Sequence, residues 1–216
     1  MINDSTENKI LQAATKLFYE NSSEKVTMRD IAAECGISPG NLTYYFRKKE
    51  DLFAVIYQDM LVKEYERYSE GFQKDAGENP WIFFVAANYA HLRIVAGSEK
   101  GMSDYIYATR YPSAREAYIS ANSDLLYKCL ADTRYAKDRK KVHIASLAGC
   151  GGEFVALYTY KTKRDEYSFD ELIFPTLSVR MLLLDVHPGE INSIIEKGKG
   201  KTSFLTATAT SLFSLE

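Results

Sequence analysis

The sequence is poor in the residues from which disulfide frameworks and metal sites are built. It has three cysteines and three histidines among 216 residues. An odd number of cysteines without paired spacing favours a reducing compartment, and we expect the protein to be cytoplasmic. The histidines are widely separated, and neither Cys-x-x-Cys nor His-Glu-x-x-His occurs. We therefore expect no metal site and no cofactor.

Long apolar runs and a strong net charge are also absent. No apolar segment approaches the roughly 18 residues that a membrane-spanning helix needs, and the polar N-terminus lacks the pattern of a secretion signal. The formal net charge is -2, which does not suit a protein that coats nucleic acid indiscriminately. Alternation of β-branched residues is nearly absent as well, so we expect an all-α fold without membrane contact.

What the sequence does contain is a pair of helix-start signals separated by a glycine. Thr27 can cap a first short helix, with Asp30 placed three residues later as in a capping box. Gly36 stands where the chain must reverse, because glycine tolerates positive φ without penalty. Ser38 and Pro39 then restart a helix as N-cap and first helical residue. This order predicts a helix-turn-helix, the arrangement that places a helix in the DNA major groove.

The second helix of this motif, expected at residues 38–46, carries side chains that suit DNA. Asn41 can read an adenine edge, and the hydroxyls of Thr43 and Tyr44 can reach phosphates. The basic run at residues 47–49 follows directly and is placed to hold the phosphate backbone. The alternative is a solvated polar helix followed by a basic turn.

An amphipathic helix with Ile10, Leu11, Ala14, Leu17 and Phe18 at helical spacing precedes the motif. With this helix, the first quarter of the chain resembles the tetracycline-repressor (TetR/AcrR) family of bacterial regulators. The family often has tyrosine where this chain has threonine at position 43, so a contact there would have a shorter reach. The resemblance implies that Pro39, Gly40, Asn41 and Tyr44 face base edges, and that Thr27, Arg29, Tyr45 and Lys49 contact the phosphate backbone. The motif and the resemblance together predict these DNA-contacting residues: Thr27, Arg29, Ser38, Pro39, Gly40, Asn41, Thr43, Tyr44, Tyr45, Lys48 and Lys49.

The chain is long enough for a second domain. We expect a helix-turn-helix DNA-binding domain at residues 1–52, a helical ligand-binding and dimerisation domain at 53–197, and a C-terminal tail at 198–216. A long helix starting after Glu50 would join the two domains. Further helices are expected at residues 80–97, 103–110, 112–132, 136–163 and 170–185.

Small residues recur at steps of four, three and four along the helix expected at 136–163, which would allow another helix to approach closely. The resemblance implies that the last two long helices form a four-helix bundle with those of a second subunit, whereas the alternative is packing within one chain. The predicted interface residues are Ala145, Gly149, Gly152, Ala156, Leu177, Met181 and Leu184.

The second domain is rich in tyrosine, whose apolar ring and polar tip suit a pocket for a flat or apolar ligand. Core packing is the alternative for each of these rings. Because the resemblance implies a sensor domain, we expect a small hydrophobic or aromatic effector to bind here. The predicted ligand-binding residues are Trp81, Phe84, Tyr89, Arg93, Tyr105, Arg110, Tyr118, Phe154 and Tyr158.

The resulting hypothesis is a homodimeric transcriptional repressor that a small-molecule effector releases from a pseudo-palindromic, double-stranded DNA operator. Two alternatives stay open: an enzyme that processes a small molecule, and an architectural DNA-binding protein without a ligand. The run Gly198-Lys-Gly-Lys-Thr202 looks like the end of a phosphate-binding loop, but the first glycine of such a loop would fall at Ile195. We therefore expect no nucleotide site there.

Overall fold

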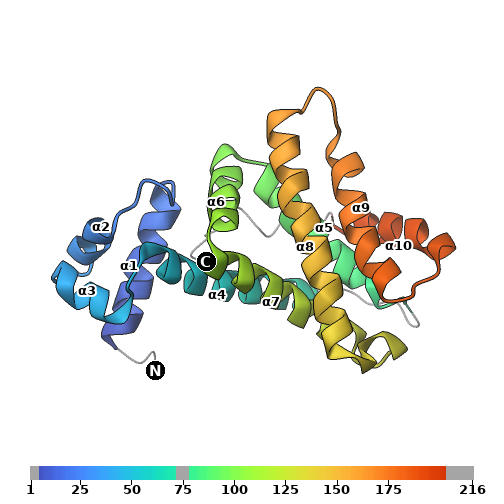
Figure 1. Ribbon diagram of the computed structural model, residues 1–216, viewed down its shortest axis with the longest axis horizontal. Helices are drawn as coiled ribbons and strands as arrows, with labels where there is room; N and C mark the ends of the chain where they lie inside the picture. Colours follow the sequence, from blue (N-terminus) through green and yellow to red (C-terminus); the bar gives the residue numbers. More distant parts are fainter. Residues whose placement is uncertain (1–4, 72–77, 203–216) are drawn as a thin grey trace.

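The fold is a chain of packed helices (Figure 1). The computed structural model describes residues 5–71 and 78–202, and in these residues it contains no strand, which confirms the all-α expectation. The helices are α1 (Thr6–Glu20), α2 (Met28–Glu34), α3 (Pro39–Tyr45), α4 (Lys49–Gly71), α5 (Trp81–Ala96), α6 (Glu99–Arg110), α7 (Pro112–Leu130), the short 3-10 helix η1 (Arg134–Lys137), α8 (Arg139–Thr162), α9 (Phe169–Leu183) and α10 (Pro188–Gly200).

Helices α1, α2 and α3 form a small unit at one end of the molecule (Figure 1). Its core consists of Ile10, Phe18, Ile31 and Leu42, all of which are fully buried. Helix α4 leaves this unit and continues along α7, so that one helix joins the two parts of the chain, as expected. A rotation of α4 would therefore also move the three-helix unit.

Helix α5 is apolar on all sides and is buried along nearly its whole length, as its sequence predicts. Helix α10 packs closely against α5. A Cβ atom at Gly198 would lie 2.5 Å from Val85 Cγ1, so only glycine permits this approach. The expectation that the tail begins at residue 198 is therefore wrong for residues 198–200, which are helical; residues 203–216 lie outside the described part.

Two helix starts also differ from the expected positions. Helix α6 begins at Glu99, because the Ser98 side chain accepts a hydrogen bond from the Gly101 amide and caps it. Helix α8 begins only at Arg139, because Asp138 caps it through the Lys141 amide. Within the described ranges, no helix combines the length and apolar character needed to cross a bilayer.

Candidate functional site

Local hydrogen bonds fix the two short helices α2 and α3. The Thr27 amide donates to Asp30 Oδ2 over 2.8 Å and the Asp30 amide donates to Thr27 Oγ1 over 3.2 Å, completing the predicted capping box. The hydrogen bonds that the Thr27 hydroxyl and the Thr27 amide donate to the Asp30 carboxylate lower the pKa of this carboxyl. Gly36 has a φ of 67° in the turn. Ser38 Oγ accepts from the Asn41 amide over 3.2 Å and caps α3. The predicted helix-turn-helix is confirmed.

Helix α3 turns its polar side away from the protein. Leu42 and Phe46 are buried against the three-helix unit, whereas Asn41 is exposed and Tyr44 is 83% exposed. Tyr45 is 39% exposed, and its ring lies edge-on to that of Tyr44 at 5.3 Å. The side chains predicted to read bases are therefore not used for packing, and they are free to meet an external partner.

Two hydroxyl groups of the predicted DNA-contacting residues form hydrogen bonds within the protein. Thr27 Oγ1 donates to Asp30 Oδ2 over 2.7 Å, and Thr43 Oγ1 donates to the Gly40 carbonyl over 2.9 Å. Both protons are thus engaged in holding helix ends, although both side chains are exposed. Arg29 and Lys48 are exposed and, with the exposed Arg47, contribute positive charge to this surface.

Lys49, which was predicted to hold the phosphate backbone, has partners within the protein. Its ammonium donates to the backbone carbonyls of Ser23, over 2.8 Å, and Glu24, over 3.1 Å, and lies 4.8 Å from the centroid of the Tyr107 ring. Burial lowers the pKa of this lysine. Lys49 therefore ties the start of α4 to the loop between α1 and α2 and is partly buried there.

Helix α6 holds the same part of the three-helix unit from the second domain. The fully buried Asp104 accepts from the Ser23 amide over 3.0 Å, and Lys100 donates to the Phe18 carbonyl over 2.7 Å and to Asp104 over 2.5 Å. Arg110, predicted to bind ligand, instead pairs with Glu24 over 2.8 Å. We call these contacts the α6 clamp.

A cavity of about 530 Å³ lies between α4, α5 and α7. Its size is typical of small-molecule sites. Apolar and aromatic side chains come from all three helices, and charged side chains are mixed with them on α4 and α7. The cavity is lined by Val62, Tyr65, Glu66, Ser69, Phe83, Ala121, Asp124, Leu125, Lys128 and Cys129.

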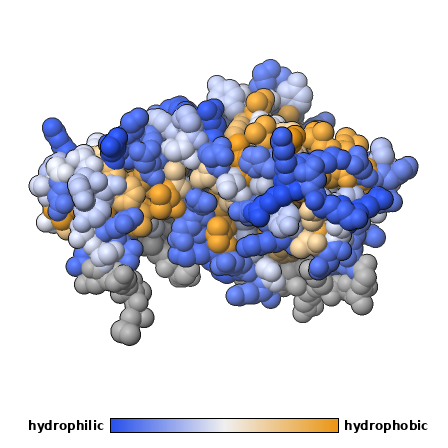
Figure 2. Space-filling view, turned by 60° about the horizontal axis from the view of Figure 1, so that its bottom comes forward, coloured by the Kyte–Doolittle hydropathy of each residue, from blue (hydrophilic) through white to orange (hydrophobic). Residues whose placement is uncertain are grey.

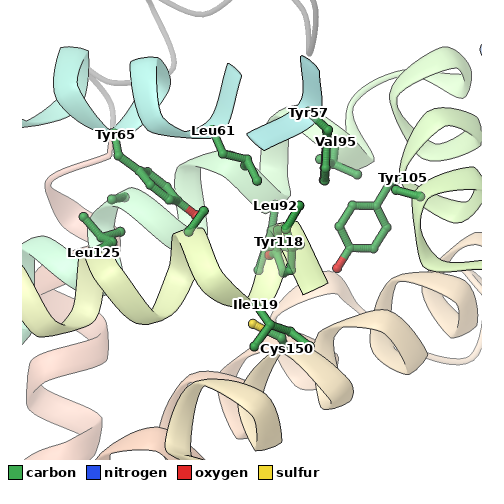
Figure 3. Close-up of a cluster of buried hydrophobic side chains, with 14 of the residues drawn as sticks. Tyr57, Leu61, Tyr65, Leu92, Val95, Tyr105, Tyr118, Ile119, Leu125 and Cys150 are labelled. Carbon is green, nitrogen blue, oxygen red and sulfur yellow. The ribbon is translucent and has the colours of Figure 1, made fainter. Parts of the chain in front are cut away.

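None of the nine residues predicted to bind ligand lines this cavity. Five of them instead pack ring against ring in the interior. The rings of Trp81 and Phe84 meet edge-on with their centroids 5.9 Å apart. The ring centroid of Tyr118 is 5.7 Å from that of Tyr105, in edge-on contact, and 5.5 Å from that of Phe154. Figure 3 shows Tyr105 and Tyr118 within this cluster, beside side chains of α4 and α5. These rings are used by the core, which was the alternative in each case.

Three more of the nine lie elsewhere, and Arg110 belongs to the α6 clamp. The Tyr89 hydroxyl donates to Asp170 over 2.6 Å, and the Arg93 guanidinium lies 4.9 Å from the centroid of the Phe169 ring. Tyr158 is on the surface, 57% exposed. The lining of this cavity could have been recognised from apolar positions on α4 and α7 that alternate with charges at helical spacing, but that pattern is also typical of an ordinary surface helix.

The stripe of small residues on α8 faces α9 of the same chain. A Cβ at Gly149 would lie 2.1 Å from Arg180 Nη1, and one at Gly152 would lie 3.2 Å from Thr176 Cγ2. The close approach that the glycines allow is therefore intramolecular, and the predicted subunit contacts are corrected accordingly. Apart from the partly buried Gly152, the predicted set is buried: Ala145, Gly149, Ala156, Leu177, Met181 and Leu184.

The opposite side of the same helix pair is apolar and exposed. Val155 is 68% exposed, and a Cβ at Gly151 would meet no atom within 4 Å. In Figure 2, hydrophobic residues gather on the half of the molecule that contains α8 and α9. We call this surface the α8–α9 face, made of Ile144, Leu147, Val155, Tyr158, Leu182 and Leu183.

A buried ion pair lies beneath this surface. Arg180 Nη1 is 2.9 Å from Glu153 Oε1, and both side chains are inaccessible to solvent. The Tyr118 hydroxyl donates to Glu153 Oε2 over 3.0 Å. Burial alone would lower the pKa of the guanidinium, but the carboxylate outweighs burial and raises it. No group of three or more potential metal ligands occurs among residues 5–71 and 78–202.

Comparison with known proteins agrees with this geometry. Residues 10–56 match the family model for bacterial regulatory proteins of the tetR family. The chain is 44% identical over 55 residues to the HTH-type transcriptional regulator UidR of Escherichia coli (strain K12), covering 25% of this chain and 28% of UidR. It is 26% identical over 148 residues to the HTH-type transcriptional repressor KstR2 of Mycolicibacterium smegmatis, covering 62% of this chain and 69% of KstR2.

The similarity of fold extends over both domains. The crystal structure of Thermus thermophilus FadR, a TetR-family transcriptional repressor in complex with lauroyl-CoA, superposes with a TM-score of 0.60 at 17% identity, covering 84% of this chain and 96% of FadR. At this identity the similarity concerns the fold alone. The N-terminal helix-turn-helix domain is therefore that of the bacterial regulatory proteins of the tetR family, and the fold of the whole chain is similar to that of a TetR-family repressor.

Proposed function

We propose that this protein is a homodimeric transcriptional repressor that releases its DNA operator when a small molecule binds in the second domain. The observation that carries the proposal is the exposure of Asn41 and Tyr44 on a capped α3 helix, which packs on the protein through the buried side chains of Leu42 and Phe46. A polar helix that packs by one side and leaves the other free suits the major groove. The proposed DNA contacts are Arg29, Ser38, Pro39, Gly40, Asn41, Tyr44, Tyr45 and Lys48.

A second subunit is needed because a single three-helix unit reads too few base pairs for useful specificity. The α8–α9 face supports this part of the proposal, because it exposes an apolar strip on the last two long helices of the domain. An isologous contact between two such faces would bury the strip and place two α3 helices on one DNA duplex. The operator would then be pseudo-palindromic.

The effector is proposed to bind in the cavity between α4, α5 and α7. Helix α4 supplies part of the lining and also enters the three-helix unit, where Lys49 holds the loop after α1. Through the α6 clamp the same loop is also attached to the second domain. A ligand that displaces α4 relative to α6 would change the spacing of the two α3 helices, and binding of ligand and of DNA would then oppose each other.

Tyr44→Ala tests the reading helix. We expect the variant to bind an operator selected from a random DNA library about tenfold or more weakly, because one base contact is worth roughly 1–3 kcal/mol. Binding to unselected DNA should change less, since phosphate contacts remain. Tyr19→Ala, at an exposed tyrosine of α1, serves as the control. An equal loss on both DNAs would assign Tyr44 to the phosphate backbone.

Lys49→Ala tests the connection between the domains. Removing the ammonium leaves the Ser23 and Glu24 carbonyls without their donor, and we expect the free energy of unfolding to fall by about 1–3 kcal/mol. The salt dependence of DNA binding should stay unchanged, because this charge does not reach phosphate. Lys48→Ala should lower that salt dependence by about one unit. A reduced salt dependence in Lys49→Ala would contradict the assignment.

A further inference from the structure

The outward side of α3 offers few groups that could read a base pair. The helix lies at the outer end of the three-helix unit, away from the second domain (Figure 1). Pro39 and Gly40 have no polar side-chain atom. The exposed polar residues of the helix are Asn41, Thr43, Tyr44 and Tyr45. Any sequence preference of α3 therefore depends on these side chains.

Two of these side chains are engaged within the protein. Thr43 Oγ1 donates to the Gly40 carbonyl over 2.9 Å, so its proton is not available to a base. Tyr45 is 39% exposed, and its ring meets that of Tyr44 edge-on with 5.3 Å between the centroids. In contrast, the side-chain amide of Asn41 and the hydroxyl of Tyr44 have no hydrogen-bond partner among residues 5–71 and 78–202. Asn41 and Tyr44 are therefore the side chains available for reading.

The composition of α3 disfavours recognition of a G·C pair. Guanine is read best by the paired donors of arginine or lysine, and cytosine by the carboxylate of aspartate or glutamate. The helix contains none of these residue types, and Arg29, Arg47 and Lys48 lie outside it, on α2 and in the turn after α3. An asparagine amide, in contrast, donates to N7 or accepts from N6 of adenine, and it can do both at once. Asn41 therefore selects adenine.

Tyr44 presents an apolar ring to the same groove. Its side chain is 83% exposed, and the methyl group of thymine is the apolar group that a base displays in the major groove. Tyr44 follows Asn41 by three residues, so the two side chains lie on one side of the helix. Their Cβ atoms are then about 5–6 Å apart, whereas base pairs are stacked about 3.4 Å apart. The two side chains therefore face base pairs that are one or two steps apart.

We infer that α3 reads two A·T base pairs in each half-site. Asn41 hydrogen-bonds to the adenine of one pair, and the ring of Tyr44 packs against the thymine methyl group of the other. A G·C pair at either position would lack the adenine edge or the methyl group and would bind more weakly. The inference rests on the proposed function, because it specifies the operator which that function requires.

The first test selects duplexes from a random DNA library with the full-length protein and with two variants. We expect the original protein to enrich an A·T pair at one position of each half-site, and Asn41→Ala to show no preference at that position. Thr43→Val is the matched control, because the hydroxyl that it removes already donates to the Gly40 carbonyl. It should keep every base preference. Both positions are exposed, so both variants should fold.

Base analogues placed in the selected duplex then test each contact by binding titration. In 7-deazaadenine the N7 acceptor is missing, and we expect the unsubstituted protein to bind about tenfold more weakly. Asn41→Ala should bind the two duplexes equally. Uracil lacks the thymine methyl group, and at the second A·T pair it should weaken binding about fourfold, with no effect on Tyr44→Ala.

Four results would overturn the inference. They are a G·C pair at the position that depends on Asn41, a 7-deazaadenine effect that persists in Asn41→Ala, a base preference that changes in Thr43→Val, and a uracil duplex that binds as tightly as the thymine duplex. In each of these cases an operator exists, so the proposed function stands and only this inference fails. If no duplex is enriched at all, the proposed function fails, and this inference fails with it.

Discussion

Glu153→Gln is expected to lower the free energy of unfolding by about 3–5 kcal/mol, because it leaves a buried cation without its counter-charge. Arg180 is fully buried, and besides Glu153 its guanidinium donates to neutral groups: the Thr176 carbonyl over 2.8 Å, Cys150 Sγ over 3.2 Å and Asn122 Oδ1 over 3.4 Å. Glutamine keeps the size of the side chain, so the effect isolates the charge. Urea titration measures the free energy of unfolding. The protein concentration is kept fixed, because dimerisation would add a concentration-dependent contribution to stability.

Two comparisons make this result specific. Glu166→Gln removes the same charge from an exposed pair with Lys163 and should cost at most about 1 kcal/mol. The double variant Glu153→Leu with Arg180→Met replaces both buried charges by apolar groups and should recover most of the loss. If Glu153→Gln is as stable as Glu166→Gln, the buried guanidinium of Arg180 does not need the charge of Glu153, and this ion pair does not stabilise the packing of α8 against α9.

The DNA-reading part of the molecule could be predicted because its signals are local. Thr27 and Asp30 cap each other within one turn, and Ser38 caps α3 within one turn, so neither interaction depends on the rest of the fold. Gly36 has the positive φ that the turn requires. Such side chain–backbone contacts depend only on neighbouring residues, so they can be predicted directly from the sequence.

The second domain could be predicted as helical, but its contacts could not be assigned. The glycines of α8 correctly indicated a close approach, yet spacing alone does not say whether the partner helix belongs to the same chain. Arg180 of α9 takes that place. Helix α10 was missed although Pro188 begins it and Ile191, Ile194 and Ile195 are buried at helical spacing. Lys49 shows the same limit, because its partners are carbonyl groups far away in sequence.

The aromatic residues predicted to bind a ligand do not line the cavity, for a related reason. A ring that lines a cavity and a ring that fills a core have the same sequence signal, and the difference is whether other rings occupy the remaining space. The rings of Tyr105 and Tyr118 pack edge to face and fill the space between them, whereas the ring of Tyr65 lines the cavity. Which of these occurs depends on the distances between α4, α5 and α7, and these are set by packing across the whole domain.

Val155→Glu is expected to separate the proposed dimer and, as a consequence, to weaken operator binding about a hundredfold or more. Val155 is 68% exposed in the α8–α9 face, on the same side of α8 as Leu147. In an isologous contact each substitution occurs twice, so two carboxylates would enter one apolar interface. Separate subunits bind half-sites independently and lose the avidity of about 10²–10⁴ that linkage gives. Analytical ultracentrifugation and operator titration measure the two effects.

Val55→Glu, at a 44% exposed position of α4, is the matched control and should remain dimeric. A Val155→Glu protein that stays dimeric would place the subunit contact elsewhere, because a buried pair of carboxylates without counter-charges is too costly to persist.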